Sequence, residues 1–377
     1  MHNFETNLKN DDNFNPLEEI IKKEIKKNSN WISFSRFMEL SLYYSDLGYY
    51  TSDKVKFGVD GDYITAPEIS FFFAKTIFKF CNEVFQNEQI EVLEFGAGSG
   101  KFALDFFKEA EKVGAFVKSY TILELSKNLK NLQQKTLQQF NQVKWLETPP
   151  NSFSGIVFCN EVLDSIPVKV VKKQKQTWME RGVSFNNNNF VYSDRKCSHE
   201  LIRQIPNPNH LPDGYITEVH PIHCSFIKLL SEIIKGKSLI LLIDYGFPAY
   251  EYYNDSRSSG TLMCHQKHHS NSDPFFQVGM QDITSHVDFS IIAKTAFKNN
   301  LSVEAFMNQS SFLLEAGLSE ILMNMNIQEV ENWHYHSNAI QKLTSPSEMG
   351  ELFKVLVLTK NFDLEKKFQK SNKKNRL

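Results

Sequence analysis

The ten residues LEFGAGSGKF, from Leu93 to Phe102, carry the most specific structural pattern in this chain. They connect an apolar run, IEVLEF, which predicts a buried strand over 90–95, to KFALDFFKEAEK, which predicts a helix over 101–112. Between strand and helix, Gly96, Gly98 and Gly100 alternate with small residues. Glycines in such a loop let the backbone approach a ligand closely, so the spacing of the glycines should indicate the ligand.

Two common nucleotide-binding patterns fit this loop poorly. A phosphate-binding P-loop needs GxxxxGK followed by Ser or Thr, but Gly96 to Gly100 is one residue short and Phe102 takes the place of the hydroxyl residue. The dinucleotide fingerprint GxGxxG needs a third glycine where Lys101 stands. What remains is an acid, Glu94, followed by GxGxG, which is the pattern of S-adenosyl-L-methionine (SAM) sites. The alternative is a tight turn that simply requires small residues.

A second acid supports the cofactor site. The segment SYTILEL, residues 119–125, predicts a second strand that contains Glu124 near its end. An acid at this place can accept hydrogen bonds from both hydroxyls of a ribose. SAM and NAD both keep these hydroxyls free, so Glu124 alone does not separate the two cofactors and the glycine spacing must do so.

Strands and helices alternate over residues 90–160, which predicts an α/β fold with a parallel sheet and helices on both of its faces. Residues 168–217 alternate in short pieces around a run of asparagines and predict an antiparallel, β-rich insertion. The predicted organisation is a flexible N-terminus (1–16), an N-terminal helical and loop cap (17–88), an α/β core with the cofactor site (89–167 and 218–360), the insertion (168–217) and a basic, disordered tail (361–377).

Net charge, apolar run lengths, cysteine spacing and the first residues indicate which binding partners and which cell compartment to expect. The 377 residues carry a formal net charge of -2, so we expect no nucleic-acid partner. The longest apolar run, Leu239 to Ile243, is too short to span a bilayer, so no membrane insertion is expected. Five scattered cysteines without a CxxC pair indicate reduced thiols.

The first residues have no hydrophobic signal core and contain Glu5, Asp11 and Asp12, so a cytoplasmic location is expected, with the mitochondrial matrix as the weaker alternative.

Several segments, in order, resemble the MidA-like family of SAM-dependent methyltransferases, whose mitochondrial branch includes a complex I assembly factor that methylates a protein arginine. The similar segments are GDYITAPEIS (61–70), LEFGAGSGKF (93–102), ILELS (122–126), NEVLDSIPVK (160–169), LLIDYG (241–246), DITSHVDF (282–289) and GELFKVL (350–356). The resemblance implies a class I methyltransferase fold, with a Rossmann-like, seven-stranded and mostly parallel sheet and one antiparallel strand near the C-terminal end. This chain departs from the family at Ala97, Ser99 and His220.

The resemblance also implies that TAPEIS packs over the cofactor and that NEVLDSIP lies beside the transferred methyl group. Together with the glycine loop and the second acid, this gives the expected cofactor-binding residues: Thr65, Pro67, Glu68, Glu94, Gly96, Ala97, Gly98, Gly100, Glu124, Leu125 and Asn160.

Four residues are candidates for catalysis. If the acceptor is a guanidinium, carboxylates must hold its cation, and Glu161, Asp164 and Asp244 are expected at the same sheet edge. Glu161 and Asp164 face one way only if the segment after the strand is helical. His286 is the fourth candidate, as a polar pair with Asp288. Each of the four also has a purely structural alternative, such as capping a helix or orienting a loop.

The sequence therefore predicts a SAM-dependent protein methyltransferase that modifies arginine on a partner protein, such as a respiratory complex subunit. Two alternatives stay open: an assembly factor that binds SAM without catalysis, and a small-molecule methyltransferase. No metal is expected, because the groups around His220 and around Cys264 lack a CxxC pair. The oligomeric state does not follow from the sequence.

Overall fold

The computed structural model describes residues 15–52, 64–86, 88–267, 269–326, 328, 331–364, 368 and 370–377. The predicted flexible N-terminus lies outside the described residues, except for Asn15 and Pro16. Asn15 is the N-cap of the first helix, and its side chain accepts a hydrogen bond from the backbone of Leu17.

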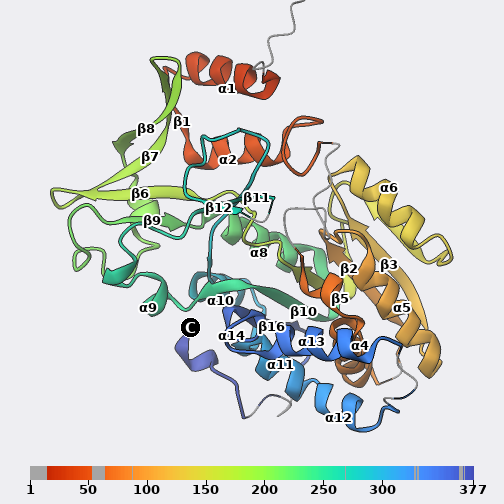
Figure 1. The fold of residues 1–377 in the computed structure, drawn as a ribbon. Helices are drawn as coiled ribbons and strands as arrows, with labels where there is room; N and C mark the ends of the chain where they lie inside the picture. Colours follow the sequence, from red (N-terminus) through yellow and green to blue (C-terminus); the bar gives the residue numbers. More distant parts are fainter. Residues whose placement is uncertain are drawn as a thin grey trace, which may run out of the picture.

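A mixed sheet forms the centre of the molecule (Figure 1). Its strands lie in the order β15 (Ser302–Asn308), β16 (Phe353–Lys360), β10 (Ile234–Phe247), β5 (Phe153–Asn160), β2 (Ile90–Phe95), β3 (Val117–Leu123) and β4 (Val143–Leu146), and β14 (Val287–Asp288) adds to β10. The strands from β10 to β4 are parallel, whereas β16 runs antiparallel to both of its neighbours. The predicted seven-stranded class I methyltransferase sheet, with one reversed strand near the C-terminal end, is confirmed.

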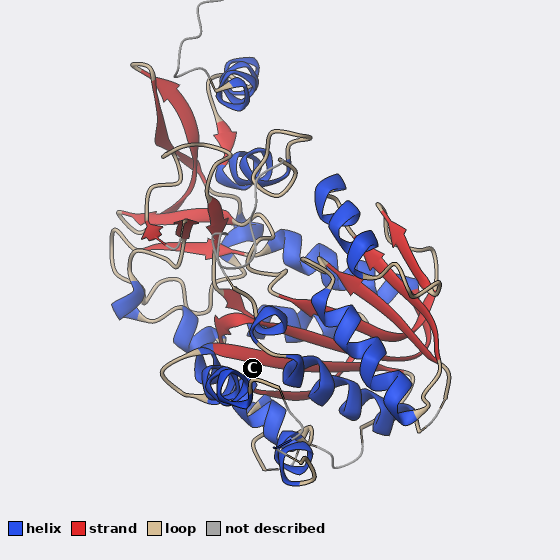
Figure 2. Ribbon diagram, turned by 45° about the vertical axis from the view of Figure 1, so that its right-hand side comes forward, coloured by secondary structure: helices blue, strands red, loops and turns tan. Residues whose placement is uncertain are grey.

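Each central strand is buried on both faces, which explains its nearly continuous apolar sequence. In β2, Ile90 and Val92 belong to one hydrophobic layer, while Leu93 and Phe95 belong to the other. Helices α4 (Phe71–Phe85) and α5 (Lys101–Val113) cover the first face, and α8 (Pro221–Ile233) and α10 (Phe289–Lys298) cover the second. Figure 2 shows helices on both sides of the sheet.

Helix α4 belongs to the core rather than to the N-terminal cap, so the expected boundary at residue 88 lies too late in the chain. The ring of Phe78 packs edge-on against Phe106 of α5, with ring centroids 5.1 Å apart. Phe72 and Phe73 are also buried in this layer. Phe72 and Phe73 therefore lie on the buried side of a core helix, whereas Phe71 is only partly buried.

The N-terminal cap and the insertion fold together, although they are far apart in the sequence. The insertion is a five-stranded antiparallel sheet in which β1 (Ile32–Ser33) of the cap pairs with β7, placing Ile32 opposite Val183. Its other strands are β6 (Lys169–Gln174), β7 (Thr177–Asn186), β8 (Asn189–Lys196) and β9 (Ile216–Val219). Helices α1 (Pro16–Lys27) and α2 (Phe34–Tyr43) share a hydrophobic core with this sheet, at the top of Figure 1.

The C-terminal tail is ordered where the structure describes it, contrary to the expected disorder over 361–377. Phe368 is buried against Phe80, with ring centroids 5.1 Å apart. Lys373 N donates to Phe306 O at 2.7 Å, and the Asn372 side chain accepts from Phe306 N at 3.1 Å. These hydrogen bonds pair backbone groups on the outer edge of β15, and this pairing explains why a lysine- and asparagine-rich segment is held in place.

The remaining elements surround this framework. They are α3 (Ala66–Ile69), α6 (Lys127–Thr136), α7 (His199–Ile202), α9 (Ala249–Tyr252), η1 (Asp255–Arg257), β11 (Met263–Gln266), β12 (His269–Asn271), β13 (Asp282–Thr284), α11 (Gln309–Glu315), α12 (Leu318–Met323), α13 (Trp333–Thr344), α14 (Met349–Leu352) and η3 (Lys374–Arg376). Strands β12, β11 and β13 form a small antiparallel sheet.

Candidate active site

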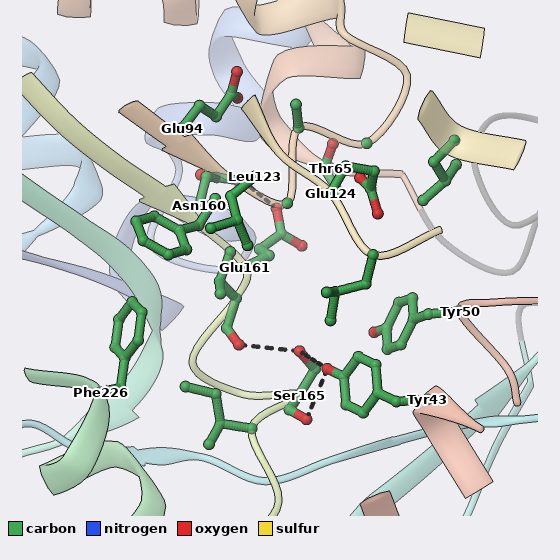
Figure 3. A pocket seen from close by; sticks show the side chains of 18 of the residues that line it. Tyr43, Tyr50, Thr65, Glu94, Leu123, Glu124, Asn160, Glu161, Ser165 and Phe226 are labelled. Atoms are coloured by element: carbon green, nitrogen blue, oxygen red, sulfur yellow. Dashed lines mark hydrogen bonds between the residues drawn. The ribbon is translucent and has the colours of Figure 1, made fainter. Parts of the chain in front are cut away.

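A cavity of about 500 Å³ lies at the carboxyl ends of β2, β3 and β5 (Figure 3). This is where the chain order of the strands reverses in the central sheet, the usual ligand site of open α/β folds. The expected residues that line it are Thr65, Pro67, Glu68, Glu94, Gly96, Ala97, Gly98, Glu124, Leu125, Asn160 and Glu161. Gly100, Asp164, Asp244 and His286 are not among the lining residues.

The glycine loop adopts a backbone that requires glycine. Gly96, Gly98 and Gly100 have φ values of +63°, +53° and +83°, in the left-handed region that side chains disfavour. A Cβ atom on Gly96 would also lie 3.3 Å from Cγ2 of Val162. Gly100 itself is the N-cap of α5 and shapes the loop from behind the cavity wall. The loop thus exposes backbone, rather than side chains, to the ligand.

Glu124 is held rigidly at the edge of the cavity. Its Oε1 accepts from Ser126 N at 2.9 Å, and its Oε2 accepts from Gln133 Nε2 at 2.9 Å. Gln133 also donates to Gly98 O at 2.9 Å and accepts from Trp145 Nε1 at 3.0 Å. This fully buried glutamine, from α6, therefore connects the two parts of the expected cofactor site. Nothing in the amphipathic sequence of α6 distinguishes Gln133 from its neighbours, and sequence reasoning missed it.

Glu94 lines the cavity but is buried, and its Oε2 accepts from the hydroxyl of Tyr120 at 2.7 Å. Burial raises the pKa of Glu94 to about 8, the Tyr120 hydrogen bond opposes this, and the charge of Glu124 adds to it. The carboxylate points away from Glu161 in Figure 3. Glu94 thus supports the wall of the cavity from beneath the loop.

Helix α3 closes the cavity beside the glycine loop. Glu68 accepts a hydrogen bond from Ser99 Oγ, which joins the TAPEIS segment to the loop. Ala66 N donates to Oε1 of Glu161 at 3.4 Å, which joins the same segment to the end of β5. The family resemblance implied that TAPEIS packs over the cofactor, and its place over the loop is compatible with that role.

Glu161 follows β5 and occupies the middle of the cavity wall, beside Asn160 (Figure 3). Its φ is +53°, a strained value for a residue with a side chain, and such strain is concentrated at functional sites. Asn160 Nδ2 donates to Glu161 Oε1 at 3.0 Å. Burial raises the pKa of Glu161 to about 8, the nearby charge of Asp164 raises it further, and the Asn160 hydrogen bond opposes both.

Asp164 and Asp244 stabilise the turn after β5 instead of facing the cavity. Asp244 Oδ2 accepts from the backbone N–H groups of Val162, Leu163 and Asp164 at 2.8–3.2 Å. Asp164 accepts from the hydroxyl of Tyr245. The turn is not helical, so Glu161 and Asp164 do not share a face. The structure therefore favours a positioning role for both aspartates over the catalytic role that we expected.

His286 also lies behind the cavity. Its ring packs against Tyr245 and Phe247, with centroids 5.3 and 5.1 Å apart, and burial together with the charges of Arg257 and Lys354 lowers its pKa to about 4. Asp288 caps α10 by accepting from Ser290 N and Ile291 N. Oδ1 of Asp288 thus caps the helix, while the ring of His286 contacts Tyr245 and Phe247, so the geometry favours a structural role for Asp288 over the expected His286–Asp288 pair.

Sequence reasoning missed the part of the wall that comes from the cap and α8. Tyr43 and Tyr50 line the cavity from α2 and the turn after it, Ser165 lies beside Tyr43, and Phe226 of α8 lies across from them (Figure 3). Tyr43 is separated by more than a hundred residues from Ser165, to which it hydrogen-bonds. Only a fold that brings the N-terminus over the sheet unites them, so no local motif could have identified these residues.

Within the described ranges, no three His, Cys, Asp or Glu side chains are arranged to hold a metal ion. His223, from one of the two groups considered for zinc, makes a hydrogen-bonding contact between Nε2 and Leu163 O at 2.7 Å. Its partner His220 packs edge-on against it, with ring centroids 4.7 Å apart. None of the described helices combines the length and apolar character that crossing a bilayer requires.

The chain is similar to known methyltransferases in both sequence and structure. Residues 73–307 match the model of a family of SAM-dependent methyltransferases. A solved COG1565 superfamily member from Burkholderia thailandensis, bound to S-adenosyl-homocysteine, is 36% identical, with 96% of each chain covered and a TM-score of 0.89. The protein arginine methyltransferase NDUFAF7 of Danio rerio is 25% identical over 85% of this chain and 82% of its own, and that of Homo sapiens is 24% identical over 88% and 81%.

These comparisons correct one expectation and support another. The cytoplasmic location expected from the N-terminus is contradicted, because the curated relatives from Danio rerio, Drosophila melanogaster and Homo sapiens are named as mitochondrial proteins. The expected cofactor is confirmed by the family and by the product bound in the Burkholderia structure. The positive-φ glycines and the anchored Glu124 fit that cofactor. The chain belongs to the family of S-adenosyl-L-methionine-dependent methyltransferases, and it is an enzyme of the class I fold.

Proposed function

We propose that this enzyme transfers a methyl group to an arginine side chain of a partner protein. The observation that carries the proposal is the excess of carboxyl groups over basic side chains in the lining of the cavity, together with the place of Glu161 in the middle of its wall. Among the described residues that line the cavity, the acidic and basic side chains are those of Glu68, Glu94, Glu124 and Glu161 and of Lys101, whose ammonium pairs with Asp105. Such a lining favours a cationic acceptor over an acidic one. Relatives named as protein arginine methyltransferases support the same acceptor.

Each part of the cavity would have a separate task. SAM, when bound, supplies an activated methyl group. The backbone of the glycine loop would hold its amino-acid part, and the Glu124 carboxylate would accept hydrogen bonds from the ribose hydroxyls. Glu161, in the middle of the wall, would hold the guanidinium and orient one nitrogen along the line of transfer. Water would compete for the methyl group, so the bound acceptor would have to displace it from the cavity.

The reaction balances without a metal or a redox partner. A new nitrogen–carbon bond forms as the sulfur–carbon bond breaks, and the methylated nitrogen loses one proton. Glu161 is the candidate to accept this proton, because its carboxyl group lies in the middle of the cavity wall and would be ionised while it holds the guanidinium. Asp164 and Asp244 would hold the turn that carries Glu161, since Asp244 accepts from backbone N–H groups of the turn and Asp164 accepts from the hydroxyl of Tyr245.

The test is methyl transfer from isotope-labelled SAM to proteins of cells that lack the gene, followed by mass spectrometry of the labelled peptides. Respiratory complex subunits are the first candidates that the family resemblance implies. We expect a mass increase on arginine with the wild-type enzyme and a loss of at least about a hundredfold with Glu161→Gln. Glu232→Gln, on the exposed side of α8, is the matched control. Label on lysine, or full activity of Glu161→Gln, would contradict the proposal.

A further inference from the structure

We infer that Tyr43 and Tyr50 form the wall that receives the planar guanidinium of the acceptor and sets the preference for arginine over lysine. The inference rests on the proposed function and names the acceptor end of the same cavity. The two rings are nearly parallel, with centroids 5.4 Å apart and planes inclined by 20°. Both come from the N-terminal cap, and both line the cavity.

The position of the rings separates them from the cofactor residues. Figure 3 shows Glu161 between two groups of side chains, with Asn160 and Glu124 on one side and Ser165 and Tyr43 on the other. Since the glycine loop and Glu124 belong to the cofactor end, the acceptor must approach Glu161 from the tyrosine end. Ile166, Pro167 and Phe226 complete this end with apolar surface, which suits the aliphatic stem of an arginine.

The hydroxyls of the two tyrosines are already engaged. The Tyr43 hydroxyl lies 3.0 Å from Ser165 Oγ and 3.1 Å from Ser165 O, and the Tyr50 hydroxyl lies 2.9 and 3.0 Å from the two carboxylate oxygens of Asp282. Asp282 is buried in β13. These hydrogen bonds occupy the hydroxyls, so we expect an incoming group to contact the ring surfaces rather than the hydroxyls.

An aromatic surface beside a carboxylate discriminates between the side chains of arginine and lysine. A guanidinium is flat and can stack on a ring while its N–H groups reach the carboxylate of Glu161. An ammonium is a compact, strongly hydrated charge and gains less from the same surface. A cation against an aromatic face strengthens binding by about fivefold to thirtyfold in a partly desolvated site. The cap therefore contributes the acceptor preference, while the sheet contributes the cofactor site.

The experiment uses the full-length protein labelled with fluorotyrosine and saturated with S-adenosyl-homocysteine. N-acetyl-arginine amide is titrated against it, and the fluorine NMR signals of Tyr43 and Tyr50 are assigned by their loss in Tyr43→Phe and Tyr50→Phe. We expect both signals to shift in a saturable way with the arginine probe, and to shift at concentrations at least about tenfold higher with N-acetyl-lysine amide. The exposed Tyr335 serves as the control signal, which should not move.

Two variants test whether the aromatic face is responsible. Tyr50→Phe keeps the face and should bind the arginine probe within about twofold of wild type, whereas Tyr50→Leu should weaken it about tenfold with unchanged affinity for S-adenosyl-homocysteine. Signals that do not move at any probe concentration, or equal binding of the lysine probe, would overturn the inference. Arginine methylation by the wild-type enzyme is measured separately, so the proposed function can stand when this inference fails.

Discussion

Gln133 donates from one side-chain nitrogen to both Glu124 Oε2 and Gly98 O, each at 2.9 Å. The glutamine thereby links the acid at the end of β3 to the glycine loop after β2. These two segments do not adjoin in sequence, yet both must be correctly placed for one cofactor. Because Gln133 is fully buried, it can act only through these partners.

Replacing Gln133 by leucine should therefore weaken the cofactor site without touching the cofactor. We expect an affinity for S-adenosyl-homocysteine about tenfold lower and a free energy of unfolding about 1–3 kcal/mol lower, since the variant leaves buried acceptors unpaired. Calorimetric titration and urea unfolding measure the two effects. Gln134→Leu, one residue later on the exposed face of α6, should change neither.

Gly96→Ala should reduce cofactor affinity by about tenfold, because a left-handed backbone and a Cβ that crowds Val162 both move the loop. Gly214→Ala provides the control: Gly214 has φ +84°, but an added Cβ there meets nothing within 4 Å. Both variants should lose about 1 kcal/mol of stability. Only the first should show weaker binding in calorimetry, and equal losses of affinity would contradict the role of the loop.

Glu94 should make the protein less stable as pH rises. Its folded pKa, near 8, lies above its ordinary value of 4.5, so between these values the folded state keeps a proton that the unfolded chain has released. The contribution of this group to stability is complete below about pH 4.5 and is lost progressively up to about pH 8. Glu94→Gln stays neutral, so its stability relative to wild type should increase over this interval.

Urea unfolding of the cofactor-free protein at several pH values measures this difference. The exposed Glu232→Gln should show no such trend. A difference between Glu94→Gln and wild type that is the same at all pH values would mean that Glu94 is already ionised in the folded protein.

The acceptor KM should fall as pH rises from neutrality to about 9. In the acceptor-free cavity the raised pKa of Glu161 keeps part of the population protonated at neutral pH, whereas a guanidinium binds the ionised form. Acceptor binding should therefore release protons, which calorimetry in buffers of different ionisation enthalpy detects. Glu161→Gln should abolish both the proton release and this part of the pH dependence, and an unchanged KM profile in that variant would assign the titration to another group.

The sequence predicted those parts of the site that are formed by one short, continuous segment of backbone. The glycine spacing and the acids Glu94 and Glu124 were identifiable because strand, loop and helix adjoin in the chain. Asp244 was harder to interpret: an acid at a strand end can face the ligand or the neighbouring turn, and here three backbone N–H groups of residues 162–164 bind it. Tyr43 escaped prediction because its place depends on how the cap packs, which no short-range pattern encodes.

The pairing of Ile32 with Val183 also constrains the order in which the polypeptide folds. Strand β1 precedes the central sheet in the chain, yet its partner β7 leaves the ribosome only after strands β2 to β5 of that sheet have been synthesised. The earliest helices must therefore wait, with their apolar sides uncovered, for a later part of the chain. A nascent chain halted before β7 should consequently be a strong substrate for chaperones, even though the enzyme itself has a well-covered core.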